Sequence, residues 1–264
     1  MTVTPQSSTH SATCSGQYGY SEQKPEHNDA WTTQAAPVGQ KQTFRGRAGG
    51  TMLPRSINLV IGPGPNWARC TAVDHRKWKT VDMVKEWADY VVYFANFKGL
   101  PLPDDSVGAI YASHTMEHTP MHVSPRIFKE FHRVLLPGGF LRVITPNPRV
   151  TMQHYLAGDN NFSLFQRRRR IQHSGHNWTP FELLRSDFLS VSHQPDQLGG
   201  TGLAHQNAWD AETMIKDFHR AGFRTAYESA YNRSRSGEYS FEGPGGCHSE
   251  ADQADRSLYV EGRA

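Results

Sequence analysis

Three histidines recur at intervals of four residues in the stretch ASHTMEHTPMH: His114, His118 and His122. Histidine titrates near neutral pH, so each could act as a general base, and on one helix the three could hold a metal ion. Pro120 interrupts such a helix early and no HExxH motif accompanies it, so we expect no metal site. His118, just beyond a predicted strand, is our candidate general base. The alternative is a packed or helix-capping histidine.

A glycine turn precedes this stretch, within residues 57–74, INLVIGPGPNWARCTAVD. Ligands of a parallel sheet bind outside the carboxyl ends of its strands, and glycines there let backbone N–H groups approach a charged group. Gly62 and Gly64 follow the predicted first strand, and Asp74 ends a predicted second strand, where it could accept two ribose hydroxyls. An ordinary turn gives the same pattern, so both interpretations stay open at this point.

A run of four arginines occupies residues 167–170. Such a run could bind a phosphorylated or acidic substrate or a nucleic acid, but more often it forms a solvated face or local ion pairs. No interleaved aromatic residues support stacking on bases, and the net charge is only +3. We favour the solvated face, and we expect a small-molecule substrate and no nucleic-acid partner.

The elements that would position these residues alternate between strand and helix. The helix predicted over residues 125–135 is amphipathic and ends at a PGG triplet. Strands are predicted at residues 57–61, at 71–74, towards the end of 100–114, and at 140–147, while residues 82–94 form an amphipathic and then apolar segment. A further helix over residues 211–223 and two paired edge strands within 224–231 and 256–264 complete the pattern. This alternation predicts an α/β fold with a doubly wound, Rossmann-like sheet, mostly parallel with an antiparallel edge strand.

The ends and the middle of the chain differ from this pattern. Residues 1–50 are polar and lack periodicity, so we expect a flexible N-terminal arm, followed by a single domain over residues 51–264. Residues 149–205 are irregular and rich in histidine and arginine. We interpret them as an insertion that forms a substrate lid with the arm, together with His173, His176 and Trp178.

The composition bears on the expected cellular location of the protein. No apolar run is long enough to cross a membrane, and no secretory signal is visible at the amino end. The three cysteines form no CxxC pair, so we expect reduced thiols in a cytoplasmic protein. A homodimer is a further expectation.

Two longer stretches carry a family resemblance: LPLPDDSVGAIYASHTMEH and FKEFHRVLLPGGFLRVITPN. Over about residues 57–148 the chain resembles the class I S-adenosylmethionine-dependent methyltransferases. The subgroup it resembles is the type 11-like one, with ASH…EH and RVLxPGG motifs. The resemblance implies S-adenosylmethionine as cofactor and a methyltransferase sheet.

The resemblance also implies roles for individual residues. Its cofactor-binding positions are Gly62 and Gly64 at the methionine end, Asp74 on the ribose, Asn96 at the adenine amino group, Phe97 on the adenine ring, and Ser113 and His114 near the sulfonium. Glu117 and His118 follow one turn later on the substrate side, as the catalytic candidates.

The implied function is methyl transfer to an O- or N-nucleophile of a small molecule, a natural product or sugar-like metabolite. The turn departs from the family pattern, however. Val60 replaces a glycine or an acid, and its Cβ would crowd the cofactor, while Pro63 and Pro65 remove two backbone donors. The alternative is therefore a methyltransferase-like protein that has lost methyl transfer, and that acts as a binding subunit or uses the pocket for another reaction.

Overall fold

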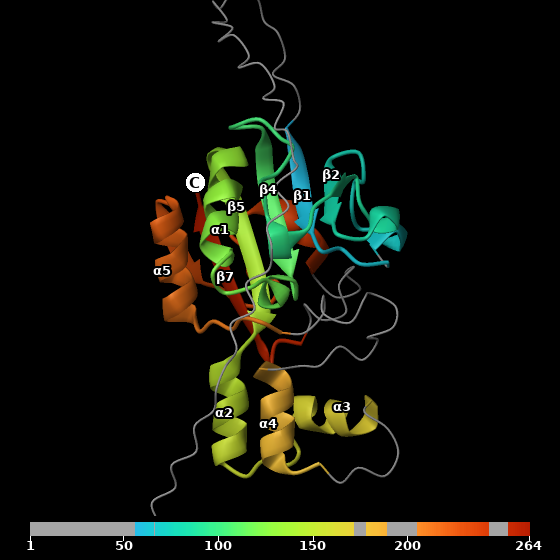
Figure 1. Ribbon diagram of the computed structural model, residues 1–264, viewed down its shortest axis with the longest axis vertical. Coiled ribbons are helices and arrows are strands. Elements are labelled where there is room, and N and C mark those ends of the chain that lie inside the picture. Colours follow the sequence, from blue (N-terminus) through green and yellow to red (C-terminus); the bar gives the residue numbers. More distant parts are fainter. Residues whose placement is uncertain (1–55, 66, 172–177, 189–204, 243–252) are drawn as a thin grey trace, which may run out of the picture. The chain divides into compact units, whose positions relative to one another are not determined.

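The protein is described here by a computed structural model, which covers residues 56–65, 67–171, 178–188, 205–242 and 253–264. Among these residues, seven strands form one sheet in the order β3-β2-β1-β4-β5-β7-β6 (Figure 1). β7 is antiparallel to both of its neighbours, and the remaining pairs are parallel. The predicted fold class is confirmed; β7 lies one position inside the edge strand β6.

The described elements are strands, α-helices and short 3-10 turns. The strands are β1 (Ile57–Ile61), β2 (Trp78–Asp82), β3 (Tyr90–Val91), β4 (Val107–Ser113), β5 (Leu135–Pro146), β6 (Thr225–Glu228) and β7 (Ser257–Arg263). The α-helices are α1 (Ser124–Val134), α2 (Pro148–Leu156), α3 (Ser163–Ile171), α4 (Pro180–Phe188) and α5 (Ala211–Ala221). Short 3-10 turns are η1 (Trp67–Arg69), η2 (Lys85–Trp87), η3 (Phe94–Asn96), η4 (Met116–His118) and η5 (Gly237–Glu242).

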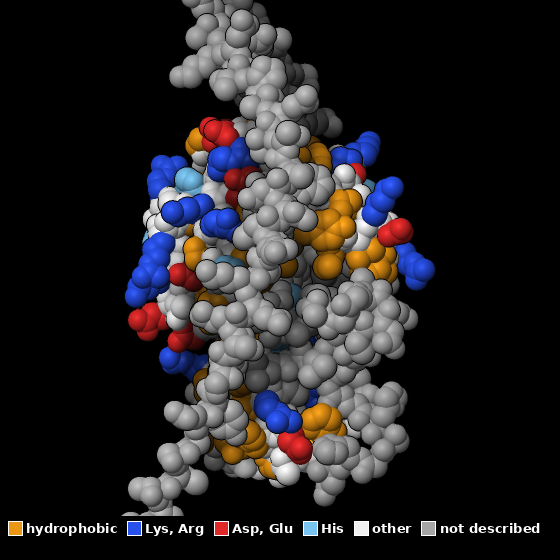
Figure 2. Space-filling view, viewed as in Figure 1, with side chains coloured by type: hydrophobic (Ala, Val, Ile, Leu, Met, Phe, Trp, Pro, Cys, Tyr) orange, Lys and Arg blue, Asp and Glu red, His pale blue; other side chains and the backbone are white. Residues whose placement is uncertain are grey.

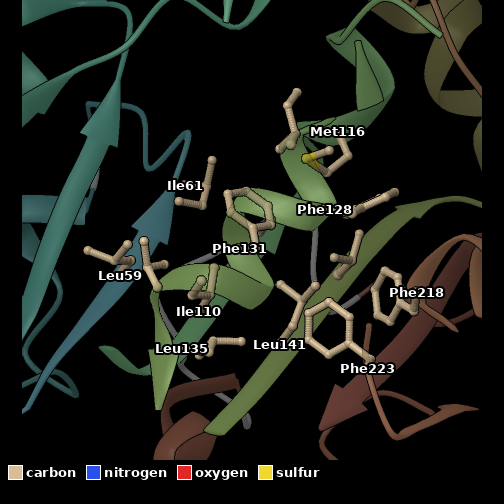
Figure 3. Packing of buried hydrophobic residues seen from close by; sticks show 14 of the residues in the cluster. Leu59, Ile61, Ile110, Met116, Phe128, Phe131, Leu135, Leu141, Phe218 and Phe223 are labelled. Carbon is tan, nitrogen blue, oxygen red and sulfur yellow. The ribbon is translucent and has the colours of Figure 1, made fainter. Parts of the chain in front are cut away.

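One face of the sheet is covered by α1 and α5. Both helices direct a buried apolar stripe inward, as their 3.6-residue period predicts. Their side chains join strand residues in one large cluster, in which Phe128, Phe131 and Phe218 lie on Leu141 and Ile110 (Figure 3). Acidic and basic side chains are interspersed over the outer side of these helices (Figure 2), as expected for their solvated face.

The opposite face of the sheet is covered by aromatic rings and an ion network. Trp67 from η1 and Tyr239 and Phe241 from η5 pack with Trp78 and Tyr111 of the sheet. Successive strand residues point to opposite faces, so Leu141 and Val143 belong to the helix-covered side while Ile144 belongs to the aromatic side.

Arg142 is the ionic centre of this second face and is fully buried. Its guanidinium donates to Glu242 Oε1 at 2.8 Å and to Glu261 Oε1 at 2.8 Å, and also to the carbonyl oxygen of Ala230 at 2.8 Å. Burial opposes the charged form, but the two carboxylates hold the pKa of Arg142 above its ordinary value. The charge is therefore fully paired.

One of the predicted elements is wrong. Residues 71–74 lie in turns and the second strand is β2, which begins four residues after Asp74. The amphipathic and then apolar segment of residues 82–94 comprises the last residue of β2, then η2, the two-residue strand β3 and the start of η3. Asp89 explains part of this, because its carboxylate accepts from Thr80 N at 2.9 Å and folds the segment back along β2.

The region 149–205 is more regular than its composition suggests. Its described parts form α2, α3 and α4, whose apolar residues make a separate small cluster. Asn147 caps α2 by accepting from Val150 N, and Pro148 fits the first helical turn. Trp178 packs in the small cluster, whereas His173, His176 and the N-terminal arm lie outside the described residues.

Two further findings bear on the expected setting. Cys70 is disulfide-bonded, so the expectation of reduced thiols is wrong for this residue. None of the helices in the described ranges combines the length and the hydropathy needed to cross a membrane.

Candidate active site

A cavity of about 330 Å³ lies at the carboxyl ends of β1, β2 and β4. This is the edge of a parallel sheet at which ligands bind, and the volume suits a molecule of cofactor size. Its lining combines glycine backbone, one acid, three aromatic rings and several polar side chains: Gly62, Gly64, Asp82, Met83, Val84, Trp87, Tyr93, Phe94, Ala95, His114, Thr115, His118, Thr119 and Gln206.

The glycine turn forms one wall of this cavity. Gly62 has φ +62°, and a Cβ there would lie 2.3 Å from Thr115 Oγ1, so only glycine fits. Thr115 Oγ1 in turn donates to Ile61 O at 3.0 Å, which ties the end of β1 to the loop after β4. The N–H of Gly62 is used within the sheet, where it donates to Val81 O at 2.8 Å.

The altered residues of the turn have different consequences. Val60 is fully buried in the aromatic cluster on the other face of the sheet, so the expected crowding of the cofactor by its side chain is wrong. Pro63 and Pro65 have no backbone N–H. The N–H of Gly62 already donates to Val81 O of β2. Within residues 62–65, Gly64 is therefore the residue whose N–H could be directed to a carboxylate of the cofactor.

Asp74 is not at the cofactor end of the sheet. Its carboxylate accepts from Arg76 Nε at 3.0 Å, and its side chain is 51% exposed. It lies beside Ile57, at the beginning of β1 and thus at the opposite end of the strands. The acid that ends the second strand is Asp82, which is 7% exposed, lines the cavity and accepts from Val84 N at 3.0 Å.

The adenine-binding candidates also shift by a few residues. Asn96 is exposed and is not among the cavity-lining residues, and Phe97 is buried in the helix-side core. Phe97 stacks on Phe94 with ring centroids 5.7 Å apart. Phe94 and Tyr93 line the cavity instead, so they provide the exposed aromatic surface that was assigned to Phe97.

The loop after β4 brings the predicted catalytic residues together. Ser113 is buried behind the wall, whereas His114 and His118 line the cavity. His114 has φ +48°, and this turn places its Nδ1 3.4 Å from Glu117 Oε1 and its Nε2 3.2 Å from Ser257 Oγ. His118 Nε2 lies 4.0 Å from the same carboxylate oxygen.

A third histidine, His205, completes this group. Its ring lies 4.9 Å from that of His118, and its Nδ1 is 2.7 Å from Asp187 O. Burial lowers the pKa of His205 and outweighs the attraction of Glu117. Burial alone would raise the pKa of Glu117, but the histidines, His114 foremost, hold the pKa of its carboxyl below the ordinary value. Glu117 is therefore ionised at neutral pH beside the neutral imidazole of His205.

The sequence reasoning missed Asp82, Thr115 and His205. The run WKTVD, an alternating segment closed by an acid, was the signal for Asp82. Thr115 lies inside the quoted ASH…EH stretch but faces glycine rather than substrate. His205 has no sequence signal, because its place depends on the chain returning to η4: Gln206 N and Asn207 N both donate to Glu117 O, at 2.7 and 3.0 Å.

The arginines of residues 167–170 lie in the last turns of α3. Arg167 donates to Gln253 Oε1 at 3.1 Å and Arg169 to Asn160 O at 3.0 Å. Neither lines the cavity.

Comparison with known proteins gives one family match. Residues 62–143 match the family model described as a methyltransferase domain, the segment that runs from the glycine turn into β5. The strand order 3-2-1-4-5-7-6 with its antiparallel β7 is the methyltransferase sheet that the sequence resemblance implies. Over this segment the chain is similar to the S-adenosylmethionine-dependent methyltransferases. These findings support the predicted family, enzyme class and cofactor.

Similarity to individual proteins is distant. No curated protein matches the sequence. A methyltransferase from Mesorhizobium loti is 16% identical, covering 80% of this chain and 94% of that one, with a TM-score of 0.44. A methyltransferase of Haloferax volcanii, solved with the activator Trm112, is 15% identical over 80% and 83%, with a TM-score of 0.43. One from Archaeoglobus fulgidus is 10% identical over 80% and 87%, with a TM-score of 0.43.

Proposed function

We propose that this methyltransferase binds S-adenosylmethionine in the cavity at the ends of β1, β2 and β4 and methylates an oxygen or nitrogen of a small molecule. The observation that supports this most directly is the combination of a buried acid, Asp82, with the Gly62–Gly64 turn and the rings of Tyr93 and Phe94 around one cavity. An acid for ribose hydroxyls, a backbone donor for a carboxylate and an aromatic surface for adenine match the three parts of this cofactor.

The cofactor supplies a methyl group that is already activated by its sulfonium. The residues of the chain then have to orient the acceptor, exclude water and accept a proton. His118 is the proposed general base, because its side chain is 25% exposed at the cavity wall and Glu117 lies behind it to stabilise the protonated imidazole. Glu117 is a positioning residue in this scheme, since it is buried and absent from the cavity lining.

The acceptor is proposed to be a natural product or sugar-like metabolite with hydroxyl or amine groups. Thr119, Gln206 and His118 offer polar contacts near Trp87 and Tyr93. Hydrogen-bonding groups beside aromatic rings suit a polar molecule with an apolar face. The proposal is of a free small molecule, and the expectations of a cytoplasmic location and a homodimer stay predictions.

The test compares Asp82 with Asp74, because each of these acids ends a strand-like run in the sequence. Asp82→Asn should weaken S-adenosylhomocysteine binding by about 10- to 100-fold in calorimetry, the loss of a hydrogen bond to a charged group. Asp74→Asn should leave the affinity unchanged, because Asp74 lies at the other end of the sheet. Equal effects of the two variants would overturn the assigned cofactor pocket.

Methyl transfer itself is tested with a panel of hydroxylated and amine acceptors, with S-adenosylhomocysteine release as the readout. Turnover that falls in His118→Gln while cofactor affinity is kept supports the base. Cofactor binding without turnover on any acceptor class would instead favour a protein that has lost methyl transfer, the alternative that Pro63 and Pro65 motivate.

A further inference from the structure

Three side chains of metal-ligating type meet beside the cavity, at the part of its wall that His118 forms. Glu117 and His118 come from η4 and His205 from a distant segment, and one potential ligand atom from each lies within 4.8 Å of the others. The backbone fixes the meeting point, because Gln206 N donates to Glu117 O at 2.7 Å and Gln206 Nε2 donates to His118 O at 3.0 Å. The group is thus built by the fold and is not a chance cluster of surface residues.

The described residues pair the carboxylate of Glu117 only loosely. The residue is 1% exposed, and neither carboxylate oxygen receives a hydrogen bond from any residue in the described ranges. The nearest imidazole nitrogens are His114 Nδ1 at 3.4 Å and His118 Nε2 at 4.0 Å, both beyond good hydrogen-bond distance. A buried carboxylate left in this state is costly, and a cation between the three side chains would satisfy it.

The surrounding contacts orient the ligands as metal sites require. His205 Nδ1 is held 2.7 Å from Asp187 O, which leaves Nε2 as the ring atom available to an ion. His114 orients the carboxylate of Glu117 in a similar way: its Nε2 lies at Ser257 Oγ and its Nδ1 is directed towards Glu117. Ligating histidines usually donate their second ring N–H to a carbonyl or carboxylate in this way.

We propose that Glu117, His118 and His205 bind a divalent transition-metal ion of the zinc class. Two imidazoles and one carboxylate form a three-ligand set that leaves a further coordination position open, and imidazole disfavours Mg²⁺ and Ca²⁺ relative to Zn²⁺ or Co²⁺. Because His118 lines the cavity, an ion held by these three residues would lie beside the space where an acceptor would bind.

The role of the ion rests on the proposed function. An acceptor hydroxyl that took the open position would lose its proton more readily: the O–H bond would break, the electron pair would stay on oxygen, and the proton would pass to bulk water. With the ion bound, His118 and Glu117 are ligands, and the ion replaces His118 as the group that promotes loss of the proton. This set differs from the His114, His118 and His122 ladder considered in the sequence. His122 is exposed and lies outside the group.

The experiment uses the full chain without an affinity tag, stripped with a chelator and titrated with Co²⁺, whose visible absorption reports coordination. We expect one ion per chain, displaced by Zn²⁺. Glu117→Gln and His205→Gln should each weaken Co²⁺ binding by more than about 100-fold, beyond the loss typical of residues that only orient a ligand. His122→Gln, the matched control, should bind as the unaltered chain does.

Far-ultraviolet circular dichroism checks that each variant folds, and His118→Gln replaces either variant that does not. Absence of stoichiometric Co²⁺ binding, or equal affinity in the ligand variants and in His122→Gln, overturns the site. Calorimetry with S-adenosylhomocysteine on the same samples separates the two proposals: metal binding without cofactor binding rejects the proposed function alone, and cofactor binding without metal binding rejects the ion alone.

Discussion

The two faces of the sheet are covered in different ways. On one face, α1 and α5 pack a continuous apolar cluster of phenylalanine, leucine, isoleucine and valine against the strands. On the other face, η1 and η5 supply aromatic rings, and Arg142 is buried with Glu242 and Glu261. On the helix-covered face, small changes in side-chain volume should lower stability in small steps. On the second face, stability depends on the ion pairs of Arg142 with its two buried carboxylates.

This difference follows from what joins the strands. The segment between β1 and β2 contains only a short 3-10 turn among its described residues, and the segment between β2 and β3 contains η2. Residues near the carboxyl end of the chain therefore cover that face, with Tyr239 donating to the carbonyl oxygens of Ile110 and Phe140 at 2.9 and 2.8 Å. The second face is an assembly of residues that are far apart in sequence.

The largest expected effect is at Arg142. Arg142→Met should lower the free energy of unfolding by about 3 to 5 kcal/mol, because it leaves two buried carboxylates without a cation. Adding Glu242→Gln and Glu261→Gln to this variant should restore part of the loss. Urea denaturation measures both changes, and a loss below about 1 kcal/mol for Arg142→Met would contradict full burial of the network.

The neighbouring residue tests the other face from the same strand. Leu141→Ala should cost about 2 to 4 kcal/mol by loss of burial and creation of a cavity. Since Leu141 packs against the helices and Arg142 against the carboxylates, the Glu242→Gln change should leave the cost of Leu141→Ala unaltered. Strong coupling between these two positions would show that the faces are not independent.

The same contrast explains how much of the fold could be predicted. The bounds of β1 are predicted correctly, those of β7 to within one residue and those of α1 and α5 to within two, because an apolar period of 3.6 or 2 reports burial directly. The second strand was misplaced at residues 71–74 because TAVD looks like a strand by itself. What selects residues 78–82 is pairing with β1 and the return of Asp89 to Thr80, which composition does not encode.

The candidate site divides along similar lines. Gly62, Gly64, His114 and His118 lie in motif stretches and do line the cavity. Asp74, assigned as the end of a predicted strand, and Asn96 and Phe97, assigned by the family resemblance, each lie away from the cavity lining. Asp74 precedes the actual second strand, and Phe97 packs in the helix-side core. His205 could not be predicted at all, since only tertiary contacts bring it to Glu117.

A smaller effect is expected at the hydroxyl that ties η5 to the sheet. Tyr239→Phe should lower the free energy of unfolding by about 1 to 2 kcal/mol, because the carbonyl groups of Ile110 and Phe140 lose a buried donor. Tyr93→Phe is the matched control, since Tyr93 is 60% exposed and should change stability by less than about 0.5 kcal/mol. Equal stability of the two variants would mean that the aromatic face is held by ring packing alone.

The smallest effect is expected at the outer edge of the helix-covered face. Glu130 on α1 accepts from Leu100 N at 2.7 Å and from Arg133 Nε at 2.8 Å. The Arg133 hydrogen bonds lower the pKa of Glu130 and outweigh its burial. Glu130→Gln should therefore cost about 1 kcal/mol at pH 7, a value reduced by solvent screening.

The pH dependence of this cost has a definite sign. A carboxyl whose pKa is lower in the folded chain contributes its stability above the unfolded pKa, about 4.3 for glutamate, and loses it as the pH falls through the folded pKa. The difference in unfolding free energy between the unaltered chain and Glu130→Gln should be constant from pH 7 to about 5.5 and shrink below that. A difference that grew towards acid pH would mean that Glu130 is held in its protonated form, and the contact of α1 with the loop before β4 would then be neutral, unlike the charged pairs that hold the opposite face.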